Sequence, residues 1–269
     1  MRITKERETD GVAQRDFELD VDGERVPGTL WRASAGPPAD VLICMGHGGS
    51  QHKKTAGIRS RAREYAQRRG WATLAIDAPG HGDRISREEA VKRAREVGAR
   101  VRGLGPARPF DAEQLRAMAA RSQRAIPEWK AALDATLTSG LVDPVPRVGY
   151  WGVSMGTAIG VPFVASEPRI QCAVFGLAGL RAGANALADA AKQIAIPVQF
   201  VFQWDDAVAS REGGIALFEA FSSIEKSMHI NPGGHLGIPG FERDAWLAFY
   251  DRHLGSSVAD ESAGRSAKS

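Results

Sequence analysis

Residues 150–157 read Tyr-Trp-Gly-Val-Ser-Met-Gly-Thr, which places a serine between two glycines where an apolar strand is expected to become a helix. A tight strand-to-helix turn of this form holds the serine in a strained backbone conformation and projects its hydroxyl from the sheet. Side chains at Gly152 or Gly156 would collide with neighbouring backbone, which explains the glycines. The stretch therefore predicts that Ser154 is a nucleophile on a tight turn.

Apolar strands and helices alternate on both sides of this turn. Two alternating segments flank Asp22-Gly23 and predict an antiparallel hairpin at 15–21 and 24–32. Further strand candidates lie at 40–45, 71–76, 147–153, 170–175, 196–202 and 225–230. Helices are expected at 55–69, 127–138, 155–166, 184–193, 212–221 and 241–254. The alternation predicts an α/β fold with a mostly parallel central sheet flanked by helices.

The stretch between Arg84 and Ile126 departs from this pattern, because it consists of highly charged helical segments at 86–97 and 111–124. It is longer than one crossover needs. It leaves the sheet after the strand that ends near Asp77, and folds of this kind bind their ligands at that edge. We therefore expect a helical insertion, or cap, at about 84–126. An elongated ordinary crossover with solvated faces is the alternative.

Composition favours one globular domain. The 269 residues are 43% hydrophobic and 25% charged, which suffices for a substantial core. We expect a single domain at 1–255 and a flexible tail at 256–269, which has no apolar period. The first ten residues lack the apolar core of a secretory signal, and no apolar run approaches the roughly 18 residues that span a bilayer. A cytoplasmic protein without a membrane partner is predicted, and no pattern indicates its oligomeric state.

The basic residues and the cysteines argue against two other kinds of site. The formal net charge is only +3, and the arginines concentrate in helical stretches such as 59–69 and 84–102, without interleaved aromatic residues. Solvated helix faces are therefore favoured over nucleic-acid binding. Cys44 and Cys172 lie in apolar runs and form neither a metal-ligand spacing nor a disulfide framework. We expect buried thiols, no metal and no nucleic-acid partner.

An acidic pair follows the strand at 196–202. A carboxylate at Asp205 or Asp206 could accept a hydrogen bond from a histidine, fix its tautomer and stabilise its protonated form. Only one of the two is expected to serve, because adjacent side chains point in different directions. The other would cap the helix that begins near Arg211.

The histidine best placed to act as a base is His235, in the glycine-rich loop 231–237 between the last strand and the last helix. Such a loop can fold back and bring the imidazole to Ser154. His47 and His81 also lie at strand ends, but both precede the nucleophile turn, and we expect them to hydrogen-bond to loop backbone. The other three histidines are more simply structural or surface residues.

Acyl transfer also needs donors for the developing oxyanion. One is expected to be the N–H of Met155, beside the nucleophile. The second is expected from the His47-Gly48-Gly49 segment, where backbone without side chains can approach a substrate; Gly49 is the first candidate and Gly48 the second. A glycine pair alone usually marks only a turn.

These motifs together resemble the α/β-hydrolase superfamily, and within it the dienelactone hydrolase and prolyl-oligopeptidase-like serine hydrolases. The resemblance covers residues 41–254 and rests on five loops, at 47–49, 77–82, 152–156, 205–206 and 234–235. The acid of this family commonly occupies the fourth position of a G-x-x-D turn. The stretch from Gln203 to Asp206 fits that turn with glutamine in place of glycine, so the resemblance favours Asp206. Dienelactone hydrolases proper use a cysteine nucleophile, so their specific activity is not implied.

The predicted function is that of a serine hydrolase that cleaves a carboxylic ester or related acyl bond of a small molecule through an acyl-enzyme. Ser154, His235 and Asp206 would form its catalytic triad, with no metal or organic cofactor. An acyltransferase, a peptidase or a lyase would use the same residues, and a non-catalytic ligand-binding protein could retain the fold. Trp204 is expected to line the acyl pocket. Trp151 could do so too, although core packing fits it at least as well.

Overall fold

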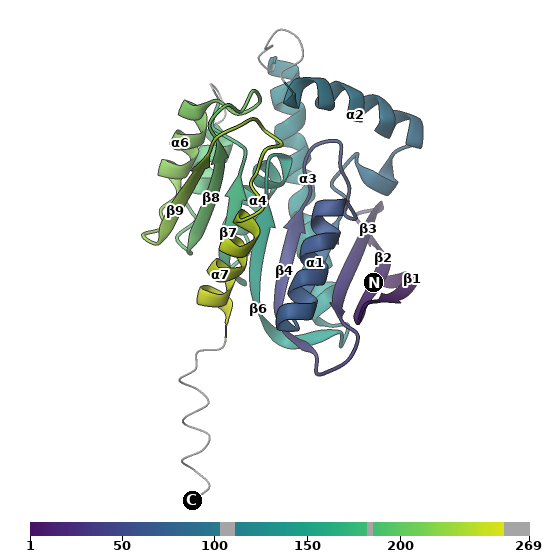
Figure 1. Cartoon of the computed structure of the whole chain (residues 1–269). Coiled ribbons are helices and arrows are strands. Elements are labelled where there is room, and N and C mark those ends of the chain that lie inside the picture. The colour runs from purple at the N-terminus through teal and green to yellow at the C-terminus, as the bar shows by residue number, and fades with distance from the viewer. Residues whose placement is uncertain (103–110, 182–184, 256–269) are drawn as a thin grey trace, which may run out of the picture.

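The computed structural model describes residues 1–102, 111–181 and 185–255. Nine strands of these residues form one sheet in the order β1-β2-β3-β5-β4-β6-β7-β8-β9 (Figure 1). The strands span Arg2–Thr9 (β1), Val12–Val21 (β2), Glu24–Ala33 (β3), Ala39–Gly46 (β4), Ala72–Ile76 (β5), Val142–Gly152 (β6), Ile170–Gly176 (β7), Val198–Gln203 (β8) and Lys226–Asn231 (β9). Strands β1 to β3 and the β3–β5 pair are antiparallel, and every other pair is parallel. The predicted α/β fold with a mostly parallel sheet is confirmed.

Helices cover both faces of this sheet. They span Ala56–Arg69 (α1), Arg87–Val101 (α2), Ala112–Leu137 (α3), Met155–Ala165 (α4), Asn185–Ala191 (α5), Arg211–Ala220 (α6) and Glu242–Leu254 (α7), with a 3-10 turn at Gly82–Arg84. Helices α1 and α7 pack on one face, and α3, α4, α5 and α6 contribute to the core on the other. Successive side chains of a strand point to opposite faces of the sheet. In β4, Val41 and Ile43 therefore join the core under α1 and α7, whereas Leu42 joins the core on the other face.

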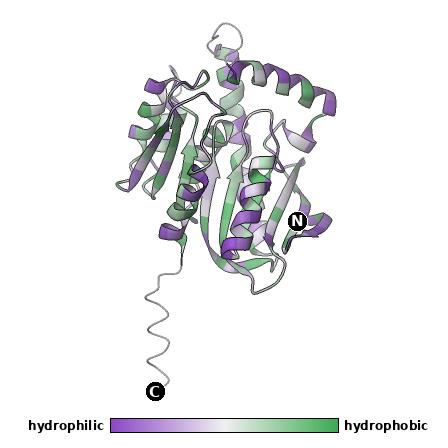
Figure 2. Cartoon of the chain, in the orientation of Figure 1, coloured by the Kyte–Doolittle hydropathy of each residue, from purple (hydrophilic) through white to green (hydrophobic). Residues whose placement is uncertain are grey.

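Figure 2 shows the consequence for hydropathy, with hydrophobic residues concentrated in the strands and hydrophilic residues along the outer side of α1. No helix formed by the described residues combines the length and the apolar character that crossing a membrane requires.

Two elements differ from the sequence prediction. Strand β1 is exposed at all eight positions, so it has no hydrophobic pattern to reveal it, and backbone pairing with β2 forms it. Helix α3 runs without a break through Pro127, where a new helix was expected. Proline removes one hydrogen bond of the helix, but Ala125 and Trp129 on either side of it are buried in the core, and this packing favours a continuous helix.

The segment expected to form a cap contributes α2 and the first half of α3. No residue of α2 is buried, and α2 lies beyond the carboxyl ends of the parallel strands, at the top of Figure 1. Part of the expected cap, residues 103–110, and the whole expected tail, 256–269, lie outside the described residues.

The parallel strands end at this same edge of the sheet. Strands β4, β6, β8 and β9 finish at Gly46, Gly152, Gln203 and Asn231, so the loops that follow them gather there. These are the loops that carry the predicted site residues.

Candidate active site

Ser154 lies on a strained turn between β6 and α4. Its φ of 59° and ψ of −118° are unusual for a residue with a side chain, and its N–H donates to the carbonyl oxygen of Gly176 at 2.8 Å. The flanking glycines are sterically required. A Cβ on Gly152 would lie 2.8 Å from backbone of Gly156, and a Cβ on Gly156 would lie 2.5 Å from the carbonyl oxygen of Gly46.

Thr157 holds the turn against the neighbouring strand, and sequence reasoning missed it. Its side chain is fully buried. The hydroxyl oxygen accepts the N–H of Gly176 at 2.9 Å and lies within hydrogen-bond distance of the carbonyl oxygens of Gly152 and Gly176, at 2.8 and 2.6 Å. The nucleophile turn is thereby tied to both β6 and β7.

His235 links Ser154 to an acid. Its Nε2 lies 2.9 Å from Oγ of Ser154, and its Nδ1 lies 2.7 Å from Oδ2 of Asp206. The side chains of His235 and Asp206 are 4% and 0% exposed, so water does not compete strongly for these bonds. Since an ionised carboxylate only accepts, Nδ1 carries the proton and Nε2 is free to accept the hydroxyl proton of Ser154.

The two adjacent aspartates have different surroundings. Oδ1 of Asp206 accepts the N–H groups of Val208 and Ala209 at 2.7 and 3.1 Å, which fixes the carboxylate with Oδ2 toward His235. Asp205 instead bonds Gly233 twice, by accepting its N–H at 3.2 Å and by donating its own N–H to the carbonyl oxygen at 3.0 Å. Asp205 therefore anchors the histidine loop.

The expectation that the second aspartate caps the following helix is wrong. Ser210 is the N-cap of α6, and its hydroxyl accepts the N–H of Gly213 at 3.1 Å. Ser210 directly precedes the helix, so its side chain reaches the free N–H groups of the first turn, whereas Asp205 is five residues earlier.

Three backbone N–H groups, those of Met155, Gly48 and Gly49, were predicted as oxyanion donors. Met155 is the first residue of α4, and N–H groups of a first helical turn have no acceptor within the helix. The N–H of Gly48 donates to Oε1 of Gln51 at 3.2 Å. A Cβ on Gly49 would meet no atom within 4 Å, so there is open space beside it. The N–H of Gly48 thus already has an acceptor within the loop, whereas the N–H groups of Met155 and Gly49 stay candidate donors.

His47 and His81 hydrogen-bond to loop backbone, as their positions suggested. Nε2 of His47 accepts the N–H of Ala78 at 3.0 Å, and Nδ1 donates to the carbonyl oxygen of Gly48 at 2.8 Å. One nitrogen of His81 lies 3.1 Å from the carbonyl oxygen of Pro79. Burial lowers the pKa of His47, and it lowers the pKa of His81 to about 4, with a contribution from His47. Both rings are therefore neutral near pH 7.

A buried ion cluster supports the same loops, and sequence reasoning also missed it. The carboxylate of Asp77 is 0% exposed and accepts Nζ of Lys53 at 2.6 Å, the N–H of Lys53 at 2.8 Å and the N–H of Asp83 at 2.9 Å. Nζ of Lys53 also reaches Asp83 at 2.6 Å. The cluster joins the segment that contains Gly48 to the loop after β5. Its only sequence signal is an aspartate directly at the end of an apolar strand.

The two tryptophans have separate positions. Trp204 is 46% exposed, precedes the acidic pair, and packs its ring against the guanidinium of Arg211 at 4.3 Å. Trp151 is 3% exposed and packs against Trp246 in the core, with the guanidinium of Arg61 3.8 Å from its ring. Core packing is thus the role of Trp151, and Trp204 stays a candidate for contact with a substrate.

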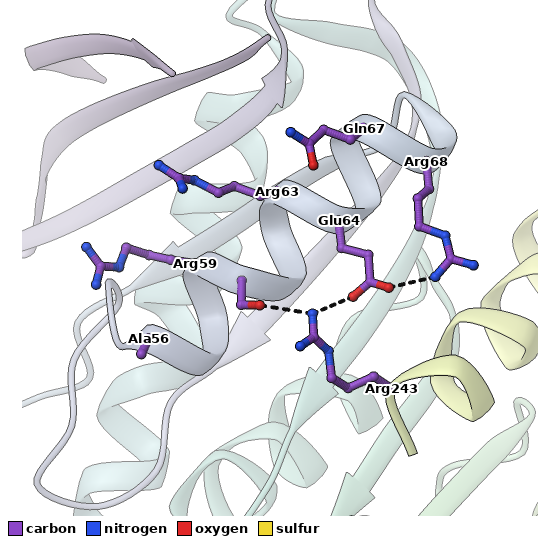
Figure 3. Close-up of a pocket in the computed structure, with 8 residues that line it drawn as sticks. Ala56, Arg59, Arg63, Glu64, Gln67, Arg68 and Arg243 are labelled. Carbon is purple, nitrogen blue, oxygen red and sulfur yellow. Dashed lines mark hydrogen bonds and ion pairs between the residues drawn. The ribbon is translucent and has the colours of Figure 1, made fainter. Parts of the chain in front are cut away.

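A cavity of about 500 Å³ lies elsewhere, on the outer side of α1 and against the start of α7 (Figure 3). It is lined by Ala56, Arg59, Ser60, Arg63, Glu64, Gln67, Arg68 and Arg243, and it includes none of the predicted site residues. Within the part of the chain that the structure describes, no group of three or more His, Cys, Asp or Glu side chains is arranged to hold a metal ion.

No protein-family model and no curated protein matches the sequence. Among solved structures, a cold-adapted esterase from an Arctic intertidal metagenomic library is 32% identical, with 94% of this chain and 100% of that chain covered and a TM-score of 0.76. Acetyl xylan esterases from Paenibacillus sp. R4 and Thermoanaerobacterium sp. are 15% and 17% identical. They cover 94% and 90% of this chain and 88% and 85% of their own chains, with TM-scores of 0.69 and 0.64, and share the fold alone.

Proposed function

The chain belongs to the α/β-hydrolase superfamily, and from this membership we propose that it is a serine esterase with Ser154 as nucleophile, His235 as base and Asp206 as orienting acid. One observation carries the proposal: the hydrogen-bond chain from Asp206 through His235 to Ser154, at 2.7 and 2.9 Å. A nucleophile, a base within hydrogen-bond reach and a third group that orients the base are the parts that acyl transfer needs.

In the first half of the reaction, Oγ of Ser154 attacks the ester carbonyl carbon while Nε2 of His235 takes the hydroxyl proton. The carbonyl oxygen becomes an oxyanion, which the N–H groups of Met155 and Gly49 would stabilise, and each such donor is worth about 3 to 4 kcal/mol. Asp206 stabilises the imidazolium that forms. As the C–O bond to the alcohol breaks, His235 returns the proton to the leaving oxygen, and the acyl group stays on Ser154.

In the second half, a water molecule takes the place of the alcohol. His235 removes a proton from this water as its oxygen attacks the acyl carbon, and then delivers the proton to Oγ of Ser154 when that bond breaks. The products are a carboxylic acid and a regenerated enzyme. Every proton in this cycle moves through Nε2 of His235, so the neutral tautomer that Asp206 fixes is needed at the start of both halves.

A fluorophosphonate probe tests the proposal directly. The probe should label the native protein at one site, and the Ser154→Ala variant should stay unlabelled. Thr157→Ser is a suitable control, because it changes a buried neighbour of the turn but keeps its hydroxyl. Equal labelling of wild type and Ser154→Ala would refute the proposal.

Three related reactions use the same residues. An acyltransferase would pass the acyl group to an alcohol or thiol, so product analysis with competing acceptors separates transfer from hydrolysis, which should give mainly free acid. A peptidase would cleave amide substrates, and a lyase would form its products without adding water, so amide substrates and product analysis separate both from an esterase. A ligand-binding protein without activity would retain a ligand without turnover, and would not explain a histidine directed at the serine hydroxyl.

The proposal also covers the domain organisation of the chain, its substrate and its location in the cell. Residues 1–255 would form one domain with 84–126 as a cap, an arrangement supported by the position of α2 beyond the carboxyl ends of the parallel strands (Figure 1). Trp204 would contact the substrate at the edge of the acid loop. A small-molecule ester, no cofactor and a cytoplasmic location complete the proposal.

A further inference from the structure

His235 belongs to a loop that is mostly exposed and rich in glycine. The loop runs from residue 232 to residue 241, between β9 and α7, and four of its ten residues are glycines. Glycine gives a backbone more accessible conformations than other residues do. His235 is the only buried residue of this loop. Its position therefore depends on how the two ends of the loop are held.

The first end of the loop is bonded to the acid loop that follows β8. The carbonyl oxygen of Asn231 accepts the N–H of Trp204 at 2.8 Å. Two residues later, Gly233 forms the two hydrogen bonds with Asp205 described above. Among the described residues, the backbone from 234 to 241 bonds only within the loop and to the first turn of α7. The second end of the loop is therefore held through α7.

The side chain of Glu242 joins the two ends. Glu242 is the first residue of α7, and its side chain is 1% exposed. Its Oε1 accepts Nδ2 of Asn231 at 2.9 Å, and its Oε2 accepts Nδ1 of His229 at 2.9 Å. Asn231 and His229 are two residues apart on β9, so their side chains point to the same face of the sheet. The first residue of α7 is thereby bonded, across the loop, to the last residue of β9.

A buried carboxylate is costly unless its oxygens have hydrogen-bond donors. Each oxygen of Glu242 has one donor, and a further bond extends the network to β8. Since a carboxylate only accepts, Nδ1 of His229 donates to Glu242, and Nε2 of His229 accepts Nε2 of Gln199 at 3.0 Å. None of Gln199, His229, Asn231 and Glu242 takes part in the proposed reaction. The segment whose ends they hold is the histidine loop.

We propose that Glu242 is a positioning residue of the active site. By bonding Asn231 across the loop, its carboxylate sets where Nε2 of His235 lies. Nε2 is 2.9 Å from Oγ of Ser154, and a general base acts only within hydrogen-bond reach of the proton that it takes. A displacement of about 1 Å at a reacting group can lower a rate by roughly a hundredfold. The proposal rests on the esterase function proposed above and adds a residue that does not touch the substrate.

Two substitutions each remove one hydrogen bond from the same carboxylate. Asn231→Ala removes the bond across the loop, whereas His229→Ala removes the bond two residues earlier and leaves the loop ends joined. Both variants lose a bond to a charged group, so thermal unfolding should show both to be destabilised. With an activated ester, Asn231→Ala should lower kcat at least about tenfold and keep KM within about twofold, since proton transfer is affected and substrate binding is not. His229→Ala should keep kcat within about threefold of wild type, because the loop ends stay joined.

Equal losses of kcat in Asn231→Ala and His229→Ala, or no loss in either, overturn the proposal. Glu242→Leu is the second variant, for the case that an alanine variant does not fold. Exchanging a buried charge for an apolar side chain of similar volume is often neutral for stability. Glu242→Leu removes both bonds, so kcat should fall at least about tenfold. A wild-type kcat in Glu242→Leu contradicts the proposal.

A variant that lacks the base shows whether the effect passes through His235. In a His235→Ala background, Asn231→Ala should change the residual rate by less than about twofold, because residues that act as a unit are not additive. A further tenfold loss in that background would mean that Asn231 supports some other part of the site, and it would overturn the proposal.

A spectroscopic measurement separates the positioning proposal from the esterase proposal. In protein with isotopically labelled histidine, the resonance of the Nδ1 proton of His235 reports the hydrogen bond to Asp206. This resonance should shift in Asn231→Ala and stay in place in His229→Ala. An unchanged resonance in Asn231→Ala contradicts the positioning of His235, even when the enzyme hydrolyses esters efficiently. If the resonance shifts as expected but the wild type hydrolyses no ester, the esterase function fails instead.

Discussion

Replacing Asp206 by asparagine tests the assignment of the acid at single-atom level. In the native site, Oδ2 of Asp206 accepts the Nδ1 proton of His235 at 2.7 Å. Asparagine would keep Oδ1 for the N–H groups of Val208 and Ala209 and present an NH₂ group to His235. The histidine would then accept at Nδ1 and carry its proton on Nε2, where it can no longer accept the hydroxyl proton of Ser154.

The wrong histidine tautomer determines the size of the effect, and the neighbouring aspartate supplies the control. In serine proteases the same exchange lowers kcat by about 10⁴ through the wrong tautomer, which corresponds to roughly 5 kcal/mol of transition-state stabilisation. Asp205→Asn changes the adjacent residue, which bonds only the backbone of Gly233. Asparagine retains an acceptor oxygen there, so a loss of less than about tenfold is expected.

Steady-state hydrolysis of an activated ester measures both variants, with thermal unfolding as the check that each is folded. The two aspartates should differ by at least about a hundredfold in kcat. Comparable losses in the two variants, or a larger loss in Asp205→Asn, would refute the geometric assignment of Asp206.

Three further experiments test the framework of the site. Gly156→Ala would place a Cβ 2.5 Å from backbone at the end of β4 and should reduce the free energy of unfolding by about 1–3 kcal/mol. A Cβ at Gly49 meets nothing within 4 Å, so Gly49→Ala should leave the free energy of unfolding unchanged. Urea denaturation measures both variants, and equal stability would contradict the steric argument. Lys53→Met leaves the buried carboxylate of Asp77 without its cation and should reduce the free energy of unfolding by roughly 3–5 kcal/mol. Combining it with Asp77→Asn should restore part of this loss. If the losses of the two single variants simply add in the double variant, the pair is not coupled. His81 has its pKa lowered by burial to about 4, so the unfolded chain takes up its proton first as the pH falls. About 3 kcal/mol of stability should therefore be present above pH 6.5 and lost between pH 6.5 and 4, and an undiminished loss in His81→Gln would assign it to other groups.

Hydrophobic periodicity predicted the helices and strands whose buried faces are made of regularly spaced apolar residues. Continuous apolar runs predicted the parallel strands, and the helical spacing of Ile58, Ala62 and Tyr65 is what predicted α1, whose C-cap is Gly70 with a φ of 70°. Strand β1 has no buried side chain, so its pairing with β2 has no apolar signature. The unbroken α3 depends on packing around Pro127, which a local proline rule does not include.

The candidate catalytic residues could be predicted from the sequence, whereas the contacts that support them could not. Ser154, His235 and the Asp205–Asp206 pair could be selected because each follows a predicted strand, and such ends share one edge of the sheet. The choice between the two aspartates needed the resemblance to a family, and the hydrogen bonds of Asp206 now support it. Contacts such as Lys53 with Asp77, or Thr157 with β7, join segments distant in sequence. Residue types alone do not reveal them, because any buried polar group can satisfy several partners.

Trapping the acyl-enzyme identifies the residue that receives the acyl group. The protein is mixed with a 4-nitrophenyl ester, quenched in acid within milliseconds, digested and analysed by mass spectrometry. The acyl mass should appear on the peptide that contains Ser154, in step with a burst of nitrophenol, and both should be absent from Ser154→Ala. Turnover without an acyl group on Ser154, or an acyl group on another residue that disappears at the rate of turnover, would contradict it.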